Sequence, residues 1–112
     1  MFIIGGGDFT QLPDSMFAIS QIVKAKDGNW QYERKVNMNY ARHGHSCCSL
    51  GENYIVVTGS RKEVKDAPFR TELFSINENK WMELQKINNG RHYHSSCSFE
   101  NSFVYIFCGI SN

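Results

Sequence analysis

The stretch that decides the fold is RHGHSCCSL at positions 42–50, because it returns as RHYHSSCSF at positions 91–99, 49 positions later. Two other landmarks recur at nearly the same spacing. Gly59 ends an apolar run as Gly109 does, 50 positions later, and Trp30 and Trp81 each follow a turn-like segment and are 51 positions apart. Three kinds of landmark in one order indicate an internal repeat of about 50 residues.

Within each period the sequence predicts short strands and no helix of useful length. Aromatic and β-branched residues fill positions 53–58, which end at Gly59, and turn-like residues separate the later apolar runs. We expect four strands at 43–50, 53–58, 71–76 and 80–85, preceded by strands at 2–6, 16–22 and 29–34 and followed by strands at 92–99 and 103–108. Four strands in about 50 residues are typical of a β-propeller blade.

With these landmarks in this order, the chain resembles the kelch repeat of β-propeller proteins. Gly5-Gly6-Gly7 is similar to the glycine doublet of the family, although the doublet is reduced to Thr58-Gly59 and Cys108-Gly109. Phe17 and Phe74 resemble the aromatic residue of the third strand. The resemblance assigns architectural roles to Gly5, Gly6, Trp30, Arg42, His45, Gly59, Trp81, Arg91, His94 and Gly109.

The resemblance implies an all-β fold, a kelch-type β-propeller fragment of four-stranded antiparallel blades. Residues 1–41 would form the end of one blade from its second strand, residues 42–90 a complete blade, and residues 91–112 the first two strands of the next. A length of 112 residues suggests one small domain. Propellers, however, close with about four to eight blades. We therefore expect the fragment to be incomplete on its own and to be completed by another chain or by further sequence.

Charge and hydropathy exclude several classes of function. Lys and Arg number 12 and Asp and Glu 11, so the chain lacks the basic excess of a nucleic-acid or anionic-membrane binder. The longest apolar runs are far shorter than the about 20 residues of a spanning helix. Cys47, Cys48, Cys97 and Cys108 do not have the spacing of a disulfide framework and are expected to be free, buried thiols. These features favour a reducing, cytoplasmic setting, and family analogy extends it to cytoskeletal or ciliary complexes.

A cluster of potential metal ligands also needs an interpretation. His43, His45 and Cys47 alternate and would face one way on a strand, and His92 and His94 repeat the arrangement. Each strand offers at most three ligands where a structural zinc site takes four, so we expect no metal and no cofactor. The alternative that the resemblance leaves open is a galactose-oxidase-like copper enzyme, or a zinc one, using Tyr40, Tyr93, His43 and His92. Because no nucleophile–base pair or carboxylate dyad stands out, we expect no catalysis.

The connections between strands are the expected carriers of function. In an up-and-down blade, the connections from the second to the third strand and from one blade to the next emerge together. The segment 60–70 carries four basic and two acidic residues and an aromatic anchor, and Arg and aromatic residues are favoured in binding hot spots. We expect a protein partner, with a preference for an acidic peptide segment, at Tyr40, Arg61, Lys62, Lys65, Phe69, Arg70 and Asn89.

The predicted function is thus a non-catalytic scaffold or interaction module of a larger complex. A solvated charged loop is the competing interpretation of the segment 60–70. The resemblance also leaves open a role as the substrate-recruiting part of a ubiquitin-ligase adaptor.

Overall fold

The computed structural model describes residues 1–5, 19–61, 64 and 66–111, and this part of the chain is all-β with antiparallel pairing. The first sheet contains β1 (Phe2–Ile4), β2 (Ile19–Lys24) and β3 (Trp30–Arg34). The middle sheet contains β4 (Ser46–Leu50), β5 (Tyr54–Thr58), β6 (Thr71–Ser75) and β7 (Lys80–Leu84). The last sheet pairs β9 (Ser95–Phe99) with β10 (Phe103–Phe107), and β8 (Arg91–His92) pairs with β11 (Ile110–Ser111). A single helical turn, η2, covers Ala67–Phe69.

The middle sheet is a meander in which each strand pairs with the next along the chain. β5 is the apolar run that the sequence predicts as a strand, and four of its five residues are buried. Pairing places Ile55 beside Phe74 and Phe74 beside Trp81, so these three side chains share one face of the sheet. The order and the antiparallel pairing of these four strands agree with the sequence-based expectation.

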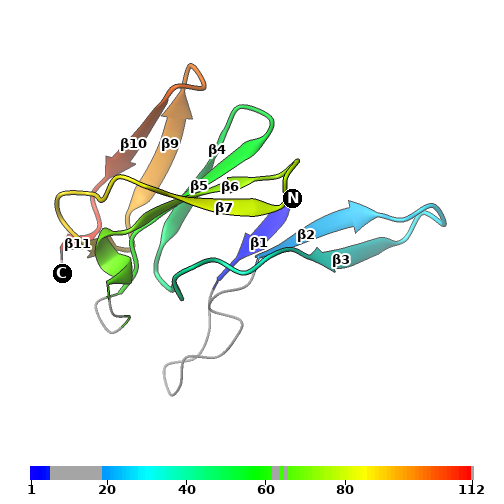
Figure 1. Cartoon of the computed structure of the whole chain (residues 1–112), viewed down its shortest axis with the longest axis horizontal. Helices are drawn as coiled ribbons and strands as arrows, with labels where there is room; N and C mark the ends of the chain where they lie inside the picture. Colours follow the sequence, from blue (N-terminus) through cyan, green and yellow to red (C-terminus); the bar gives the residue numbers. More distant parts are fainter. Residues whose placement is uncertain (6–18, 62–63, 65, 112) are drawn as a thin grey trace.

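The middle sheet lies between the other two (Figure 1). Toward the first sheet, its face forms the main core, to which Phe2 and Ile4 of β1 add their side chains. The buried members of this core are Ile19, Met38, Ile55, Val57, Phe74 and Trp81. Toward the last sheet, Ser46 Oγ lies 2.6 Å from Ser96 Oγ and Thr58 Oγ1 lies 2.7 Å from His94 Nε2. The sheets β1–β3, β4–β7 and β9–β10 therefore follow one another in chain order, and β8 and β11 form a fourth, two-stranded sheet among the described residues.

The structure corrects the spacing of the repeat. β9 and β10 each begin 49 positions after β4 and β5. At this offset the counterpart of Gly59 (φ 71°) is Cys108 (φ 58°), and not Gly109 as the sequence comparison assumed. The backbone needs the same left-handed bend after each strand, and a glycine supplies it at one place while a cysteine accepts it at the other.

The two tryptophans also fail to correspond. Trp81 pairs with Phe74, three residues after the start of β6. In the first sheet, Ile22 is likewise three residues after the start of its strand, and its partner is Tyr32. Trp30 instead pairs with Lys24, near the tip of the hairpin. Trp81 is buried and Trp30 is 68% exposed. The longer hairpin between β2 and β3 places Trp30 two positions nearer the tip. Exposure is not confined to Trp30, because all five residues of β3 are exposed and Tyr32, in the register position of Trp81, is 72% exposed.

Two expected strands begin later than predicted. β4 starts at Ser46 instead of 43, and β9 starts at Ser95 instead of 92, because Gly44 (φ 67°) and Tyr93 (φ 52°) interrupt the extended backbone. The alternation of His43, His45 and Cys47 along one strand therefore does not occur. In the first sheet, the strands expected at 2–6 and 16–22 are found at Phe2–Ile4 and Ile19–Lys24. Gly6 and Phe17 lie outside the described residues.

The cysteines are free, as expected, but they are not buried. Cys47, Cys97 and Cys108 are exposed and Cys48 is half-buried. Partial desolvation by neighbouring residues raises the pKa of the Cys47 and Cys48 thiols, even though Cys47 is exposed to solvent. No described residues form a helix long and apolar enough to cross a membrane.

Candidate interaction surface

The segment that joins β5 to β6 is held in place by one buried side chain, Arg42. Its Nη1 donates to the carbonyl oxygens of Gly59 (2.7 Å), Arg70 (3.0 Å) and Ala67 (3.3 Å). These three carbonyls lie at the two ends of the connection, so a single guanidinium group closes the loop. Such multiple donation suits the planar, always charged Arg side chain.

The charge of Arg42 is balanced by Glu72 of β6. Arg42 Nε and Nη2 donate to Glu72 Oε2 at 3.1 and 2.8 Å, and both side chains are fully buried. The other carboxylate oxygen, Oε1, accepts from the backbone N–H of Asn39 at 2.8 Å. Burial lowers the pKa of Arg42, and the Glu72 carboxylate opposes that effect. A buried charge is stable only when it is paired and hydrogen-bonded, and this pair meets both conditions.

Around this clamp lies the surface that we call the loop-end surface, formed by Tyr40, Arg61, Phe69, Arg70 and Asn89. The Arg70 guanidinium carbon lies 5.0 Å from the centre of the Tyr40 ring. Arg70 also forms an ion pair with Glu83, whose Oε2 accepts from the Tyr40 hydroxyl at 3.5 Å. The positive charge of Arg70 is therefore largely compensated inside the chain.

Phe69 is the most exposed apolar member of the loop-end surface, with 42% of its area accessible. Its ring lies on Gly90, where an added Cβ would approach ring carbons at 3.0 to 3.1 Å. The carbonyl of Phe69 accepts from the N–H of Ile87 at 2.9 Å, which joins the 59–70 and 85–90 connections. The aromatic ring is thus presented on a supported backbone.

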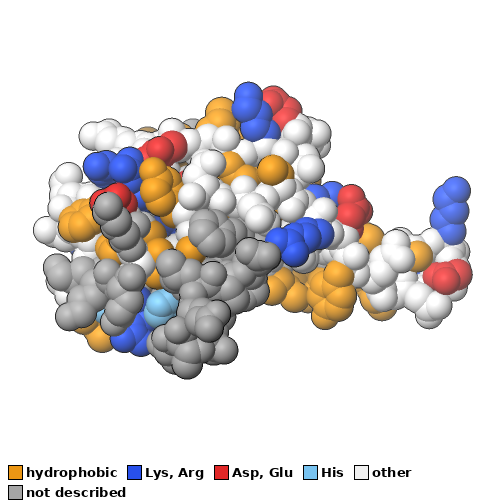
Figure 2. Space-filling view, turned by 60° about the horizontal axis from the view of Figure 1, so that its bottom comes forward, with side chains coloured by type: hydrophobic (Ala, Val, Ile, Leu, Met, Phe, Trp, Pro, Cys, Tyr) orange, Lys and Arg blue, Asp and Glu red, His pale blue; other side chains and the backbone are white. Residues whose placement is uncertain are grey.

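The structure brings most of the predicted partner-binding residues to this end of the middle sheet. Arg61 is half-buried, with its N–H donating to the His43 carbonyl at 3.0 Å, and the Asn89 carbonyl accepts from Arg91 Nε at 3.3 Å. Lys62 and Lys65 lie outside the described residues. In Figure 2, charged side chains of both signs are interspersed with hydrophobic ones over the face in view.

His45 and His94, the histidines of the Arg-x-x-His elements, each pack against a glycine that follows a strand and has a positive φ, Gly5 and Gly59 respectively. A Cβ at Gly5 would be 2.8 Å from His45 Cε1, and one at Gly59 would be 2.6 Å from His94 Cε1. Burial, helped by the charge of Arg42, lowers the pKa of His45 to about 4, and burial lowers that of His94 as well. Both imidazoles are therefore neutral at pH 7 and occupy packing positions. Among the described residues, no three His, Cys, Asp or Glu side chains are grouped to hold a metal ion.

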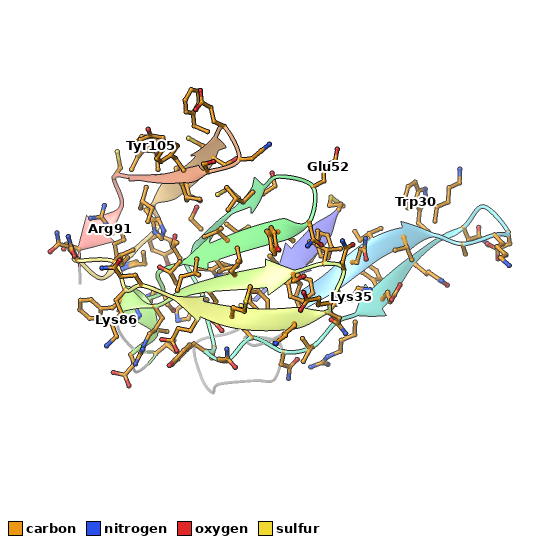
Figure 3. All side chains as sticks on the ribbon, turned by 45° about the horizontal axis from the view of Figure 1, so that its top comes forward. Trp30, Lys35, Glu52, Lys86, Arg91 and Tyr105 are labelled. Carbon is orange, nitrogen blue, oxygen red and sulfur yellow. The ribbon has the colours of Figure 1, made fainter. Side chains whose placement is uncertain are left out.

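Next to the loop-end surface is a depression of about 440 Å³, which sequence reasoning missed. Figure 3 places Lys86 and Arg91, the two basic residues of its lining, at the same end of the molecule. Its lining consists of Gln85, Lys86, Ile87, Asn88, Asn89, Arg91 and Ile106. The depression thus combines exposed amides and two cations with one apolar wall from β10.

No protein-family model matches the chain, and no curated protein matches it. The arrangement of its residues therefore carries the functional argument.

Proposed function

We propose that this chain is a non-catalytic protein-interaction module, built as part of a kelch-type β-propeller that another chain or further sequence completes. The observation that carries the proposal is the exposed ring of Phe69 on a connection clamped by buried Arg42. Backbone that is already fixed, as at the described residues 66–70 of this connection, loses little conformational entropy on binding, which favours recognition at such positions. The stacked antiparallel sheets and their 49-residue offset support the architecture.

The partner that suits the loop-end surface is a protein segment with an apolar and an acidic residue. Phe69 supplies the apolar contact, while Arg61 and the neighbouring Lys86 supply positive charge around it. The charge of Arg70 is shared with Glu83, so the preference for acidic segments is expected to be modest. The four free thiols favour a cytoplasmic setting for this interaction.

Quantitative affinity capture with paired variants tests this proposal. The immobilised 112-residue chain is compared with a Phe69→Ser, Arg61→Glu double variant and with a Lys26→Glu control. Lys26 lies in the exposed turn between β2 and β3, far along the chain from the loop-end surface. Proteins lost with the double variant and kept with the control, and enriched in acidic segments, would support the proposal. If the double variant retains every protein that the control retains, the loop-end surface is not the binding site.

A further inference from the structure

The depression beside Arg91 is the counterpart of the site around Arg42. The two Arg-x-x-His elements are 49 positions apart, and the strands that follow them keep this offset. Asn88, like its counterpart Asn39, lies three residues before the arginine, and Gln85 and Ile87 likewise take the places of Val36 and Met38. The lining of the depression therefore occupies the same repeat positions as the segment before Arg42, with Asn88 and Asn39 identical between the two.

At the Arg42 site, β6 and β7 fill the corresponding space. Glu72 binds the guanidinium group and accepts from the Asn39 N–H. Phe74 packs with Met38 in the core, and the Trp81 indole donates to the carbonyl of Val36 at 2.8 Å. β6 reaches this space because it pairs with β5, where Glu72 lies opposite Val57 and Phe74 opposite Ile55.

At the Arg91 site, the hydrogen bond from the arginine to the carbonyl after the second strand is present, but no third strand supplies a counterpart of Glu72 among the described residues. Arg91 Nη1 donates to the carbonyl of Cys108 at 3.2 Å, as Arg42 Nη1 does to the equivalent carbonyl of Gly59. Within the described residues, β10 pairs only with β9, so the edge that corresponds to the β6 side of β5 carries no strand. The depression is bounded by Arg91 and Ile106, the counterparts of Arg42 and Val57, which are the residues that contact or lie opposite Glu72 in the first site.

From this correspondence we propose that the unpaired edge of β10 and the Arg91 depression bind an extended peptide segment, with an acidic residue followed two positions later by an aromatic one. The segment adds as an antiparallel strand to β10, a recognised mode of peptide binding. Its acidic residue lies opposite Ile106 and its aromatic residue opposite Val104, the positions equivalent to Val57 and Ile55.

The charges at the site favour a carboxylate over an apolar side chain at the first position. Arg91 is half-buried, and its described hydrogen bonds go to the carbonyls of Asn89 and Cys108. Lys86 lines the same depression, and no Asp or Glu is part of the lining. A carboxylate placed like that of Glu72 receives charge-assisted hydrogen bonds from Arg91. The edge supplies backbone hydrogen bonds, and the depression supplies the specificity.

This inference rests on the proposed function and deepens it, because a strand on the β10 edge is one way in which another chain would complete the propeller. The depression shares Lys86 and Asn89 with the surroundings of the loop-end surface, but the test is made at Arg91, which is not part of that surface. The two proposals therefore fail separately. Arg61→Glu weakens partner capture without changing peptide binding at the β10 edge, whereas a change at Arg91 does the reverse.

The test uses the capped synthetic peptide TELFSIN, which copies residues 71–77 and so carries the natural occupant of the Arg42 site. Its affinity for the 112-residue chain is measured by isothermal titration calorimetry beside that of the TQLFSIN peptide. We expect the acidic peptide to bind about tenfold more tightly, since a hydrogen bond to a charged group contributes on that order. Hydrogen exchange at residues 103–107 is expected to slow when the peptide is bound.

Paired variants locate the site. Arg91→Gln is expected to remove the advantage of the acidic peptide, and Arg91→Lys to retain part of it. Arg34→Gln, a matched change at an exposed arginine of β3 whose Nη2 contacts Asn37, is expected to leave the advantage intact. Equal binding of the two peptides, an unchanged preference in Arg91→Gln, or absence of binding to the natural chain would each overturn the proposal.

Discussion

The two Arg-x-x-His elements give the molecule its most informative comparison. Arg42 is fully buried, paired with Glu72 and bonded to three backbone carbonyls, whereas Arg91 is half-buried and bonded to two. Both arginines nevertheless donate to equivalent carbonyls, those of Gly59 and Cys108, each of which directly follows the second strand of its unit. The local sequence therefore sets the position of the guanidinium group. Burial and charge balance come from strands that pair later in the chain.

The largest expected effect separates these two arginines. Removing one partner of a buried ion pair leaves an uncompensated charge, so Arg42→Ala is expected to lower the free energy of unfolding by about 3–5 kcal/mol. Arg91→Ala removes a half-buried side chain without a described ion pair and is expected to cost about 1 kcal/mol or less. Urea denaturation followed by circular dichroism measures both values.

A double variant sharpens the same measurement. Arg42→Met combined with Glu72→Leu removes both charges and keeps much of the volume, so it is expected to be more stable than Arg42→Ala alone. Equal losses for Arg42→Ala and Arg91→Ala would show that the difference in burial between the two sites has no energetic consequence.

The next effect concerns the glycine that lies between the two elements. Gly59 has a φ of 71°, and a Cβ there would lie 2.4 Å from the Arg91 carbonyl oxygen and 2.6 Å from His94 Cε1. Gly59→Ala combines backbone strain with a steric clash and is expected to cost about 2–4 kcal/mol. Gly28 has a φ of 88° with no atom within 4 Å of its added Cβ, so Gly28→Ala is expected to cost only about 1–2 kcal/mol of strain. Thermal unfolding of both variants checks the order, and a costlier Gly28→Ala would contradict it.

Much of the strand order could be predicted from the sequence, because it depends on local signals. The β-branched run 54–58 and the turn residues around it define β5, and the repeated Arg-x-x-His elements place the two sets of strands 49 positions apart. The position of Trp30 could not be predicted in the same way. All five residues of β3 are exposed, including Tyr32 in the register position of Trp81, so burial at this position depends on packing from distant segments and not on the local sequence.

The candidate site was less accessible to prediction. Glu72 and Arg42 are 30 positions apart, and no motif of residues 71–75 marks this carboxylate as the partner of that guanidinium. The sequence does contain a signal for the depression beside Arg91. Asn39 and Asn88 share the 49-residue offset of the two arginines. Extending the repeat backward from the Arg-x-x-His elements would have aligned residues 85–89, which line the depression, with residues 36–40.

The smallest of the three effects is a dependence of stability on pH, which is caused by His45 of the first Arg-x-x-His element. Burial, together with the charge of Arg42, lowers the pKa of His45 to about 4 in the fold, from an ordinary value of 6.5. The unfolded chain therefore takes up a proton on His45 at a higher pH than the folded chain does. The contribution to stability is complete above about pH 6.5 and is lost as the pH falls toward about 4.

Between pH 7.5 and pH 5 this loss is expected to be about 1–2 kcal/mol for His45. Urea denaturation at the two pH values measures it, and the His45→Gln variant serves as the comparison because it cannot titrate. The variant should lose less stability than the natural chain over this range. A remaining slope of the same sign is expected from His94, whose pKa is also lowered by burial. If His45→Gln has the same slope as the natural chain, burial and the charge of Arg42 do not hold the imidazole of His45 neutral in the folded chain.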